Sequence, residues 1–531
     1  MDRGFTGHTR QIEAATPQLT DVLLRAAARL PDKVALVRGD ERVTYGELDA
    51  RSNRLANALA RAGVARGDRV LVFLENGTEA VVAFWGALKA NAVACLINPL
   101  TKPDKLAYLL ADSKAAALVS DARLARVVEA AGPAPACLRV ALFTGGEPPP
   151  GALAWDAALA AERADTRPER KNLDIDLAAI IYTSGSTGDA KGVMLTHRNM
   201  IAASTSISAY LELREDEIIL GVLPLAFDYG LYQMIMAFQA GARLVLERSF
   251  AYPAQVLRKA VDEGVTGFPG VPTIFAILAE MRSRADFDFS RVRYVTNTAA
   301  ALPTKHIDVL REFFPNARVY SMYGLTECKR CSYLPPEDLE RKPTSVGLAI
   351  PNTELWVVDD QGRRLGPNEV GQLVVRGATV MKGYWEKPEA TAEKLRPGPL
   401  PGERVLYTGD YCRFDEEGYL YFVGRMDDII KSRGEKVPPK EVEGVLLNLP
   451  GVKEAAVVGV PDPILGQAVK AFVVLEQTAS LTDKQIRHEC QSRLEAYMVP
   501  REIVFVSDLP KTHTGKIQKT GLVEGEPRRG T

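Results

Sequence analysis

The sequence has no long hydrophobic run and no excess of charge of either sign. Its most apolar stretch, residues 80–100, is interrupted by Lys89 and Asn91, and residues 1–18 lack the apolar core of a secretory signal. The formal net charge is -1, with basic and acidic residues scattered throughout. Such a surface offers no electrostatic footprint for nucleic acid or an anionic membrane. We therefore expect a cytoplasmic enzyme with no integral membrane segment and no nucleic-acid partner.

Cysteine is also scarce, with six residues in the whole chain. So few thiols do not form a disulfide framework, and they fit a reducing compartment. Cys328 and Cys331 have the CxxC spacing, but no second pair of cysteines or histidines recurs at zinc-ligand spacing nearby. We expect these two residues to be structural thiols in the wall of a pocket.

A chain of 531 residues is too long for one hydrophobic core, which stops growing at roughly 250 to 300 residues. The first half alternates apolar runs such as "RVLVFL" (69–74) with alanine-rich stretches such as "LDARSNRLANALARAG" (48–63). This alternation predicts α/β layers around largely parallel sheets. The proline- and glycine-rich stretch 130–155 is interpreted as a surface connection.

In the last third of the chain the pattern changes to short β runs, with hairpin turns expected at 360–362 and 417–418. Helix and strand patterns then return over a segment of about 100 residues, a natural size for a small domain. We predict a large N-terminal domain, residues 1–424, of layered α/β subdomains plus a β-rich subdomain at about 354–424. A small, mobile α+β C-terminal domain, residues 425–531, completes the predicted fold.

One stretch, "YTSGSTGDAKGVMLTH" (182–197), combines glycines, hydroxyl side chains and a lysine between two apolar runs. Glycine tolerates backbone conformations that turn amide N–H groups inward, hydroxyls add donors, and lysine adds a fixed positive charge. These features favour binding of a polyphosphate. The residues concerned are Thr183, Ser184, Gly185, Ser186, Thr187, Gly188, Lys191 and Gly192.

The Walker A phosphate loop is the obvious alternative for this stretch. It needs glycine immediately before the lysine and serine or threonine immediately after it. Ala190 and Gly192 hold these two positions here, so a P-loop motor or kinase is disfavoured. A flexible serine-glycine linker is also disfavoured, because apolar runs flank the loop closely.

The stretch 182–193 resembles the signature loop of the adenylate-forming superfamily, which includes acyl-CoA synthetases, the adenylation domains of peptide synthetases, and luciferases. Four further motifs of this family follow in the same order, and together they span nearly the whole chain. They are "MYGLTE" (322–327), "YTGD" (407–410), "GRMDDIIKSRGEKVPPKEVE" (424–443) and "PKTHTGKIQK" (510–519). Five ordered matches are far more specific than any one of them.

The resemblance implies a reaction in two steps. A carboxylate displaces pyrophosphate from ATP, with Mg²⁺ as cofactor, and the resulting acyl-adenylate passes its acyl group to a thiol. The thiol belongs either to coenzyme A or to the phosphopantetheine of a separate acyl or peptidyl carrier protein, since no carrier serine motif follows residue 519. The oligomeric state is not predicted by the sequence.

The resemblance also implies roles for particular residues. Lys516 bridges the substrate carboxylate and the α-phosphate, Lys191 binds the β/γ phosphates, and Glu327 binds Mg²⁺. Asp410 accepts from both ribose hydroxyls, Arg425 contacts ribose or phosphate, and Tyr323 stacks on adenine. The implied ATP- and AMP-binding residues are Thr183, Ser184, Gly185, Ser186, Thr187, Gly188, Tyr323, Gly324, Thr326, Asp410 and Arg425.

Two further positions match the family's moving parts. Asp427 stands at the hinge on which the small domain swings, so that Lys516 is inserted for adenylation and withdrawn for thiol attack. Gly434 stands where the backbone approaches the thiol channel closely. The same resemblance therefore implies domain alternation.

The predicted acid pocket departs from the commonest pattern, because Phe227-Asp228 occupies the place where many acyl-CoA synthetases carry an aromatic residue and histidine. Peptide-synthetase adenylation domains place an aspartate here against the substrate's α-amino group. Asp228 is thus either the counterion of an amino acid or a paired structural carboxylate in a ligase for other acids. Arg330 could pair with Asp228 or with a second substrate carboxylate. The remaining pocket positions are Tyr229, Tyr232, Val295, Asn297, Met322 and Cys331.

Three classes of function stay open at this point. They are an AMP-forming acid–thiol ligase, a stand-alone amino-acid adenylating enzyme that loads a carrier, and, more remotely, a nucleotide-binding protein without catalysis. The five charged residues of the motifs argue against the last class: Lys191, Glu327, Asp410, Arg425 and Lys516.

Overall fold

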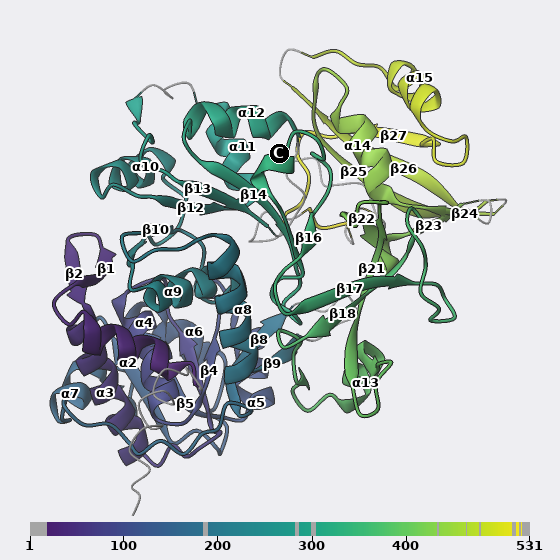
Figure 1. Cartoon of the computed structure of the whole chain (residues 1–531). Coiled ribbons are helices and arrows are strands. Elements are labelled where there is room, and N and C mark those ends of the chain that lie inside the picture. The colour runs from purple at the N-terminus through teal and green to yellow at the C-terminus, as the bar shows by residue number, and fades with distance from the viewer. Residues whose placement is uncertain are drawn as a thin grey trace, which may run out of the picture.

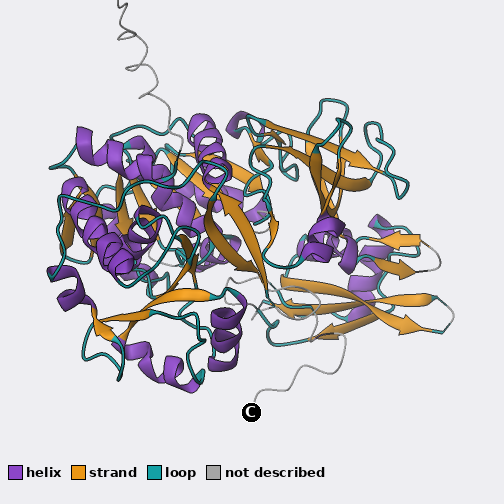
Figure 2. Ribbon diagram, turned by 90° about the horizontal axis from the view of Figure 1, so that it is seen from below, coloured by secondary structure: helices purple, strands orange, loops and turns teal. Residues whose placement is uncertain are grey.

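The computed structural model describes residues 18–183, 190–281, 286–298, 304–432, 435–463, 465–476, 479–511, 517–519 and 522. Two large mixed sheets lie in the N-terminal part of this described chain, a five-stranded β-rich sheet follows, and another five-stranded sheet lies in the C-terminal part (Figure 1). Figure 2 shows most helices gathered around the two large sheets, with the later sheets beside them.

The nine-stranded sheet has the order β16-β15-β14-β13-β12-β10-β11-β1-β2. The strands from β14 to β1 run parallel, whereas β2, β15 and β16 pair antiparallel at the edges. The carboxyl ends of β12, β13 and β14 therefore share one edge, where open α/β sheets bind their ligands. The strands are β1 (Val34–Arg38), β2 (Glu41–Thr44), β10 (Ile218–Gly221), β11 (Arg243–Leu246), β12 (Gly267–Gly270), β13 (Tyr294–Asn297), β14 (Arg318–Tyr323), β15 (Ser332–Leu334) and β16 (Leu348–Ala349).

The eight-stranded sheet has the order β19-β9-β8-β4-β3-β5-β6-β7. Its strands are β3 (Arg69–Phe73), β4 (Val93–Leu96), β5 (Ala115–Asp121), β6 (Val140–Thr144), β7 (Leu153–Ala154), β8 (Leu177–Thr183), β9 (Lys191–Thr196) and β19 (Gly383–Tyr384). β8 and β9 pair antiparallel, with Thr183 opposite Lys191. The glycine-rich loop thus connects two buried strands, as its apolar flanks predict.

The interpretation of residues 130–155 as a surface connection is wrong for its middle. Residues 140–144 form β6, which pairs in parallel with β5 and is mostly buried. The run "VALFT" is only five residues long, and prolines and glycines on both sides hide it in the sequence. Pairing with an already buried strand decides its structure, because the sheet satisfies its backbone hydrogen bonds.

Helices cover both large sheets, and α8 and α9 pack against each other between them (Figure 1). Capping boxes begin α3, at Thr44 and Glu47, and α8, at Thr196 and Asn199. α9 ends at Gly241, whose left-handed conformation (φ 71°) suits glycine. The helices here are α2 (Thr20–Arg29), α3 (Tyr45–Arg61), α4 (Thr78–Lys89), α5 (Pro103–Asp112), η1 (Ala122–Leu124), α6 (Ala125–Ala130), α7 (Trp155–Ala160), α8 (His197–Tyr210), α9 (Asp228–Ala240), α10 (Pro253–Asp262), α11 (Pro272–Glu280), α12 (Thr304–Phe313) and η3 (Pro336–Asp338).

The apolar stretch at residues 80–100 forms most of α4 and strand β4, not one long helix. Lys89, which interrupts it, is buried at the end of α4 and donates to Asp49 Oδ1 at 2.6 Å and to Ser52 Oγ at 2.8 Å. Among the described residues, none of the helices has the length and apolar character needed to span a membrane. Residues 80–97 of the stretch are buried in the described structure, and Leu100 at its end is exposed.

The β-rich sheet has the order β17-β18-β21-β20, with β22 beside β21. The turns predicted at 360–362 and 417–418 lie between paired strands, with Gly362 and Gly418 at φ near 80°, so these hairpins are confirmed. The elements are β17 (Thr353–Val358), β18 (Gly371–Gly377), α13 (Pro388–Lys394), β20 (Leu395–Pro397), β21 (Arg404–Phe414), β22 (Leu420–Arg425) and η4 (Met426–Asp428).

The C-terminal sheet has the order β24-β23-β26-β25, with β27 beside β26 and its own buried core. Its elements are β23 (Ile430–Ser432), β24 (Glu435–Val437), α14 (Pro439–Leu447), β25 (Val452–Asp462), β26 (Gly466–Leu475), α15 (Asp483–Arg493) and β27 (Glu502–Phe505). The predicted boundary between residues 424 and 425 falls at the end of β22, whose last residue is Arg425, and it stays a prediction.

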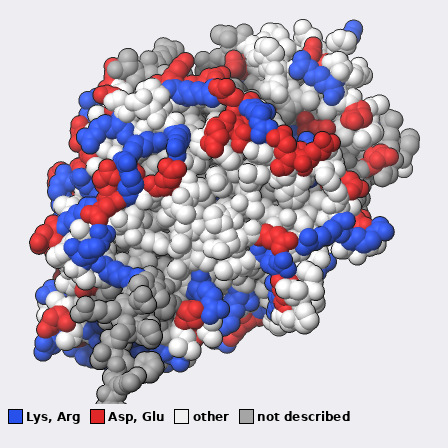
Figure 3. Space-filling view, viewed as in Figure 1, with Lys and Arg blue, Asp and Glu red and all other residues white. Residues whose placement is uncertain are grey.

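Charged side chains of both signs are interspersed on the face shown in Figure 3, around a central area of uncharged residues. No block of one sign dominates this face. The view agrees with the even charge balance of the sequence, which gives no strong field for steering a polyanion.

His197, the first residue of α8, is completely buried and gives the fold a pH dependence. The Leu19 backbone amide donates to His197 Nδ1 at 3.1 Å, so the neutral ring carries its proton on Nε2, which lies 3.4 Å from the side-chain nitrogen Nδ2 of Asn172. Protonation of Nδ1 would break the bond from Leu19. Burial lowers the pKa of His197 to about 4.

Stability should therefore fall as the pH drops from the unfolded value of about 6.5 through 4, because the unfolded chain binds the proton more tightly. The total loss from this group is about 3 kcal/mol. Urea unfolding of wild type and His197→Gln from pH 7.5 to 4 should show a shallower pH dependence in the variant. Parallel curves for the two proteins would contradict the assignment.

Candidate active site

Three residues predicted from separate motifs meet at the end of β14. The Tyr323 hydroxyl donates to Asp410 Oδ2, and Asp410 is only 2% exposed. Arg425 lies opposite Asp410 across the β21–β22 pair, with its Nε 3.6 Å from Asp410 Oδ1. The Tyr323 ring also lies 5.7 Å from the ring of Phe422. A carboxylate oriented by a phenol and a guanidinium is suited to accept hydrogen bonds from two neighbouring hydroxyls.

The loop after β14 folds back tightly, and Gly324 makes this possible. A Cβ on Gly324 would lie 2.2 Å from the Lys329 carbonyl oxygen, so no side chain fits there. The Cys331 amide donates to the Tyr323 carbonyl oxygen at 2.9 Å. Lys329 has a left-handed backbone (φ 61°), which costs energy for a residue with a side chain. This turn sends Glu327 and the residues after it to the carboxyl edge of the sheet.

Glu327, Lys191 and Tyr384 converge from three elements. The Tyr384 hydroxyl donates to Glu327 Oε1 at 2.7 Å, and Lys191 Nζ lies 5.6 Å from the centre of the Tyr384 ring. The pairing of β19 with β9 places Tyr384 here. Burial and the charge of Glu327 raise the pKa of Tyr384, so the phenol keeps its proton and remains a donor.

The donor set fits the implied magnesium ion. Tyr384 orients one oxygen of Glu327, and Mg²⁺ binds through one or two carboxylates together with substrate phosphates. Within the described ranges, no cluster of three acidic, cysteine or histidine side chains forms a complete protein cage for a metal. Glu327 would therefore hold the ion jointly with the phosphates, where it would neutralise their charge.

In the predicted acid pocket, Asp228 forms a buried ion pair with a residue absent from the predicted set. Lys329 Nζ lies 3.1 Å from Asp228 Oδ2, and the two residues are 2% and 7% exposed. Lys329 Nζ also lies 4.3 Å from the centre of the Tyr232 ring. Burial lowers the pKa of Lys329 to about 7, against the opposing effect of Asp228.

The suggestion that Arg330 pairs with Asp228 is therefore wrong: the preceding residue, Lys329, is the partner. The tight turn directs Arg330 elsewhere, and its guanidinium carbon lies 4.7 Å from the centre of the Tyr229 ring. Arg330 is 3% exposed. Lys329 and Arg330 thus have different surroundings, although they are neighbours in the sequence. The order of the residues along the chain does not show which of the two pairs with Asp228.

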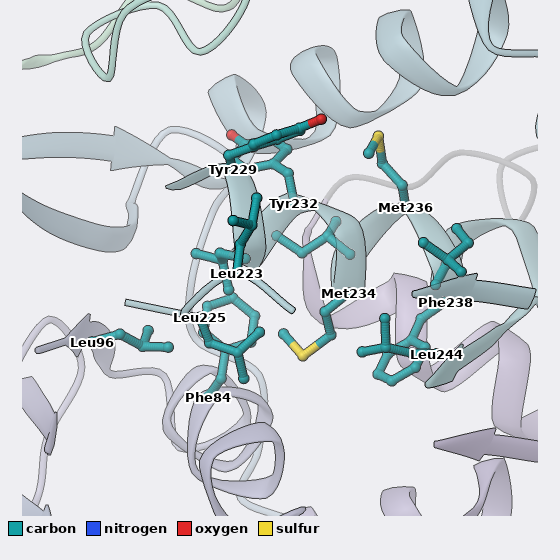
Figure 4. Close-up of a cluster of buried hydrophobic side chains, with 14 of the residues drawn as sticks. Phe84, Leu96, Leu223, Leu225, Tyr229, Tyr232, Met234, Met236, Phe238 and Leu244 are labelled. Atoms are coloured by element: carbon teal, nitrogen blue, oxygen red, sulfur yellow. The ribbon is translucent and has the colours of Figure 1, made fainter. Parts of the chain in front are cut away.

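The other predicted pocket residues lie on α9, β13 and the β14 loop. The Tyr229 hydroxyl bonds Thr296 Oγ1 at 2.6 Å, and Tyr210 donates to the Met322 sulfur at 2.9 Å. Figure 4 shows the rings of Tyr229 and Tyr232 at one end of a buried hydrophobic cluster. Phe227 is half-buried. The other three predicted positions are buried: Val295, Asn297 and Cys331.

The expectation of buried thiols is confirmed. Cys328 and Cys331 are both inaccessible to solvent, unbonded to each other, and their sulfurs lie 3.1 Å apart. The contact with Cys328 and burial raise the pKa of Cys331, so it remains a thiol. Both cysteines lie in the loop between β14 and β15, which also carries Lys329.

Several predicted residues fall outside the described part of the chain. Thr183 is described, and its hydroxyl donates to the Lys191 carbonyl oxygen at 3.4 Å across the β8–β9 pair. Thr326 is described and half-buried in the β14 loop. For Asp427 only the backbone, in η4, is described. The residues outside the described ranges are Ser184, Gly185, Ser186, Thr187, Gly188, Gly434 and Lys516, and their roles stay predictions.

Sequence reasoning missed Lys329 and Tyr384. Lys329 lies within two residues of Glu327 and next to Arg330, so a search of the motif's flank for charged residues could have found it. Tyr384 lies 57 residues beyond Glu327 in a stretch without a recognised motif. Only the pairing of β19 with β9 reveals it.

Comparison with known proteins gives consistent matches over this whole arrangement. The chain matches the family described as AMP-binding enzyme over residues 23–385 and the AMP-binding enzyme C-terminal domain over residues 441–516. A long-chain-fatty-acid–CoA ligase of Escherichia coli O157:H7 is 32% identical, over 95% of this chain and 94% of that protein. 4-coumarate–CoA ligase 5 of Oryza sativa subsp. japonica is 32% identical, over 98% of this chain and 97% of that protein.

A solved structure shows the same architecture. The anthranilate CoA ligase AuaEII in complex with anthranoyl-AMP superimposes with a TM-score of 0.87 at 29% identity, over 95% of this chain and 96% of that one. The predicted fold class, with a large α/β domain, β-rich strands and a small C-terminal domain, is thereby confirmed. The chain belongs to the AMP-binding enzyme family of the adenylate-forming superfamily, and it is an AMP-forming ligase that activates a carboxylic acid with ATP.

Proposed function

We propose that this enzyme is an acid–CoA ligase, which forms an acyl-adenylate and then transfers the acyl group to the thiol of coenzyme A. The relatives matched over nearly their full length are CoA ligases for fatty and aromatic acids. The observation that carries the choice of substrate class is the Asp228–Lys329 ion pair. Asp228 already has an internal cation, so it does not need the ammonium group of an amino acid as a partner.

In the first step, an oxygen of the substrate carboxylate attacks the α-phosphorus of ATP, and the bond to the bridging oxygen of pyrophosphate breaks. Asp410 orients the ribose, and Lys191 neutralises the leaving phosphates. Mg²⁺ held by Glu327 and the phosphates would spread the same negative charge. Lys516 would attract both reacting anions to the α-phosphate.

In the second step, the sulfur of coenzyme A attacks the acyl carbonyl carbon and AMP leaves with the electrons of the broken C–O bond. The thiol gives its proton to solvent. Lys516 has to withdraw before this attack, and we propose that rotation near Asp427 about the 424/425 boundary achieves this and brings Gly434 to the thiol. This rearrangement makes one small domain serve both steps.

The test combines acid-dependent ATP–pyrophosphate exchange with identification of the product. A panel of fatty, aromatic and amino acids is assayed first, and the active acids are then incubated with coenzyme A or a phosphopantetheinylated carrier protein. We expect exchange with acids that lack an α-amino group, and acyl-CoA detected by mass spectrometry. Exchange confined to amino acids, with acylation of the carrier and not of coenzyme A, would establish the alternative enzyme that loads a separate carrier.

A further inference from the structure

Arg330 is a buried cation that no carboxylate of the described residues neutralises. It is 3% exposed, and its Nη1 donates to the Lys329 carbonyl oxygen at 3.2 Å. Its Nε is buried without a hydrogen-bond partner in the described chain. The contact with the Tyr229 ring offsets part of the cost of burial, but it does not neutralise the charge.

The charges around Arg330 are unequal. Asp228 and Lys329 pair with each other at 3.1 Å, which leaves the guanidinium as a surplus positive charge. Burial is the main cause of the lowered pKa of Lys329, and the positive charge of Arg330 lowers this pKa further. Buried charges in proteins are normally paired, and an unsatisfied buried polar group calls for an explanation. A ligand that supplies a negative charge would be such an explanation.

The place of Arg330 indicates which ligand this is. It follows Glu327 by three residues, at the carboxyl edge of the parallel strands, and its guanidinium faces Tyr229 of α9. The nucleotide side of the same edge has its own polar set in Tyr323, Asp410 and Arg425. The Arg330 guanidinium thus belongs to the side of the site where the family match places the acid.

We propose that Arg330 binds a second carboxylate of the acid substrate, so that the enzyme prefers dicarboxylic acids. One carboxylate would be adenylated, and the other would accept hydrogen bonds from the guanidinium, whose planar N–H fork matches a carboxylate. The rings of Tyr229 and Tyr232 suit the hydrocarbon or aromatic spacer between the two groups. This inference rests on the proposed function as an acid-activating ligase.

The experiment compares acids that differ only at the far end: hexanoate with adipate, octanoate with suberate, and benzoate with phthalate and terephthalate. ATP–pyrophosphate exchange gives kcat/KM for wild type, Arg330→Met and Arg330→Lys. We expect wild type to favour the dicarboxylate of at least one pair, and Arg330→Met to lose roughly 100-fold or more on it. The ratio of kcat/KM for the dicarboxylate to that for its matched monocarboxylate should fall most in Arg330→Met, and Arg330→Lys should lie between, because lysine keeps the charge without the fork.

A stability measurement separates this role from a structural one. Removal of a surplus buried charge should leave the ligand-free Arg330→Met protein at least as stable as wild type in urea unfolding. The preferred dicarboxylate should raise the melting temperature of wild type and not that of Arg330→Met. A purely structural arginine would give the opposite result in the ligand-free protein.

Three outcomes would overturn the inference. If wild type uses monocarboxylates equally well or better in every pair, the ligase function stands and the dicarboxylate preference falls. If dicarboxylates are preferred but Arg330→Met keeps the preference, Arg330 is not the residue that binds them. If no acid supports exchange, both the proposed function and this inference fail.

Discussion

Replacement of Lys516 by alanine is expected to lower adenylate formation by about 10³-fold while ATP binding changes little. One preorganised group that stabilises developing charge is worth roughly 10² to 10³ in rate. Lys516 is predicted to meet the charge at the α-phosphate, whereas Asp410, Lys191 and Glu327 are predicted to hold the rest of the nucleotide. Rapid-quench detection of acyl-AMP measures the first quantity, and calorimetric titration with a non-hydrolysable ATP analogue measures the second.

The same motif offers a matched control. Lys519 lies three residues further on, and its Nζ is 2.6 Å from Glu443 Oε1. Lys519→Ala should leave adenylate formation within a fewfold of wild type, because the Lys519 ammonium is already paired with Glu443 and is not the lysine predicted to meet the α-phosphate. A comparable loss in both variants would mean that the motif acts through the structure of the C-terminal part, and equal losses of ATP binding and adenylation in Lys516→Ala would contradict its assigned role.

A second measurement separates the two steps. Lys516→Ala supplied with chemically prepared acyl-AMP and coenzyme A should form acyl-CoA at close to the wild-type rate, because the lysine is withdrawn when the thiol attacks. Loss of this activity as well would show that Lys516 serves both steps.

Replacement of Asp228 by asparagine is expected to destabilise the protein by about 3 to 5 kcal/mol, because it leaves the buried Lys329 ammonium without its counterion. The pair is almost inaccessible, with side-chain exposures of 2% for Lys329 and 9% for Asp228, so solvent screening does not remove the penalty. Urea unfolding at pH 5, well below the pKa of about 7 at which Lys329 becomes charged in the folded protein, measures the difference in the free energy of unfolding.

The pH dependence of this penalty has a definite sign. The folded-state pKa of Lys329 is about 7, below its unfolded value of about 10.5. The unfolded chain therefore binds the proton more tightly, and the free energy of unfolding falls as the pH is lowered from about 10.5 to 7. Without Asp228 the pKa of Lys329 falls further. The gap between wild type and Asp228→Asn should therefore widen as the pH is lowered through 7, and stay constant well above it.

A double variant tests whether the pair itself is responsible. Asp228→Asn combined with Lys329→Met removes both charges and keeps an unbranched apolar chain, so most of the lost stability should return. If the two effects simply add, the residues are not coupled. If Asp228→Asn is as stable as wild type, the carboxylate is not needed as a counterion, and its use by a substrate ammonium regains support.

The sequence by itself determined the family and most of the framework of this protein. Five ordered motifs indicate the family and predict the nucleotide-binding residues, and the alternation of apolar runs and helical stretches predicts the layered sheets. Local turn chemistry places the hairpins that end at Gly362 and Gly418. Signals of this kind are local, because a turn, a cap or a phosphate loop needs particular residues at fixed spacing.

Only the tertiary structure decided which groups the charged side chains contact, and whether segments with a weak sequence pattern form strands. The short run 140–144 becomes a strand because β5 is available to pair with it. Tyr384 contacts Glu327 because β19 pairs with β9. The left-handed backbone at Lys329 lets this residue pair with Asp228, and the next side chain, Arg330, lies against the Tyr229 ring. Charge pairing depends on distance and burial in three dimensions, and neither is encoded in the spacing of the residues along the chain.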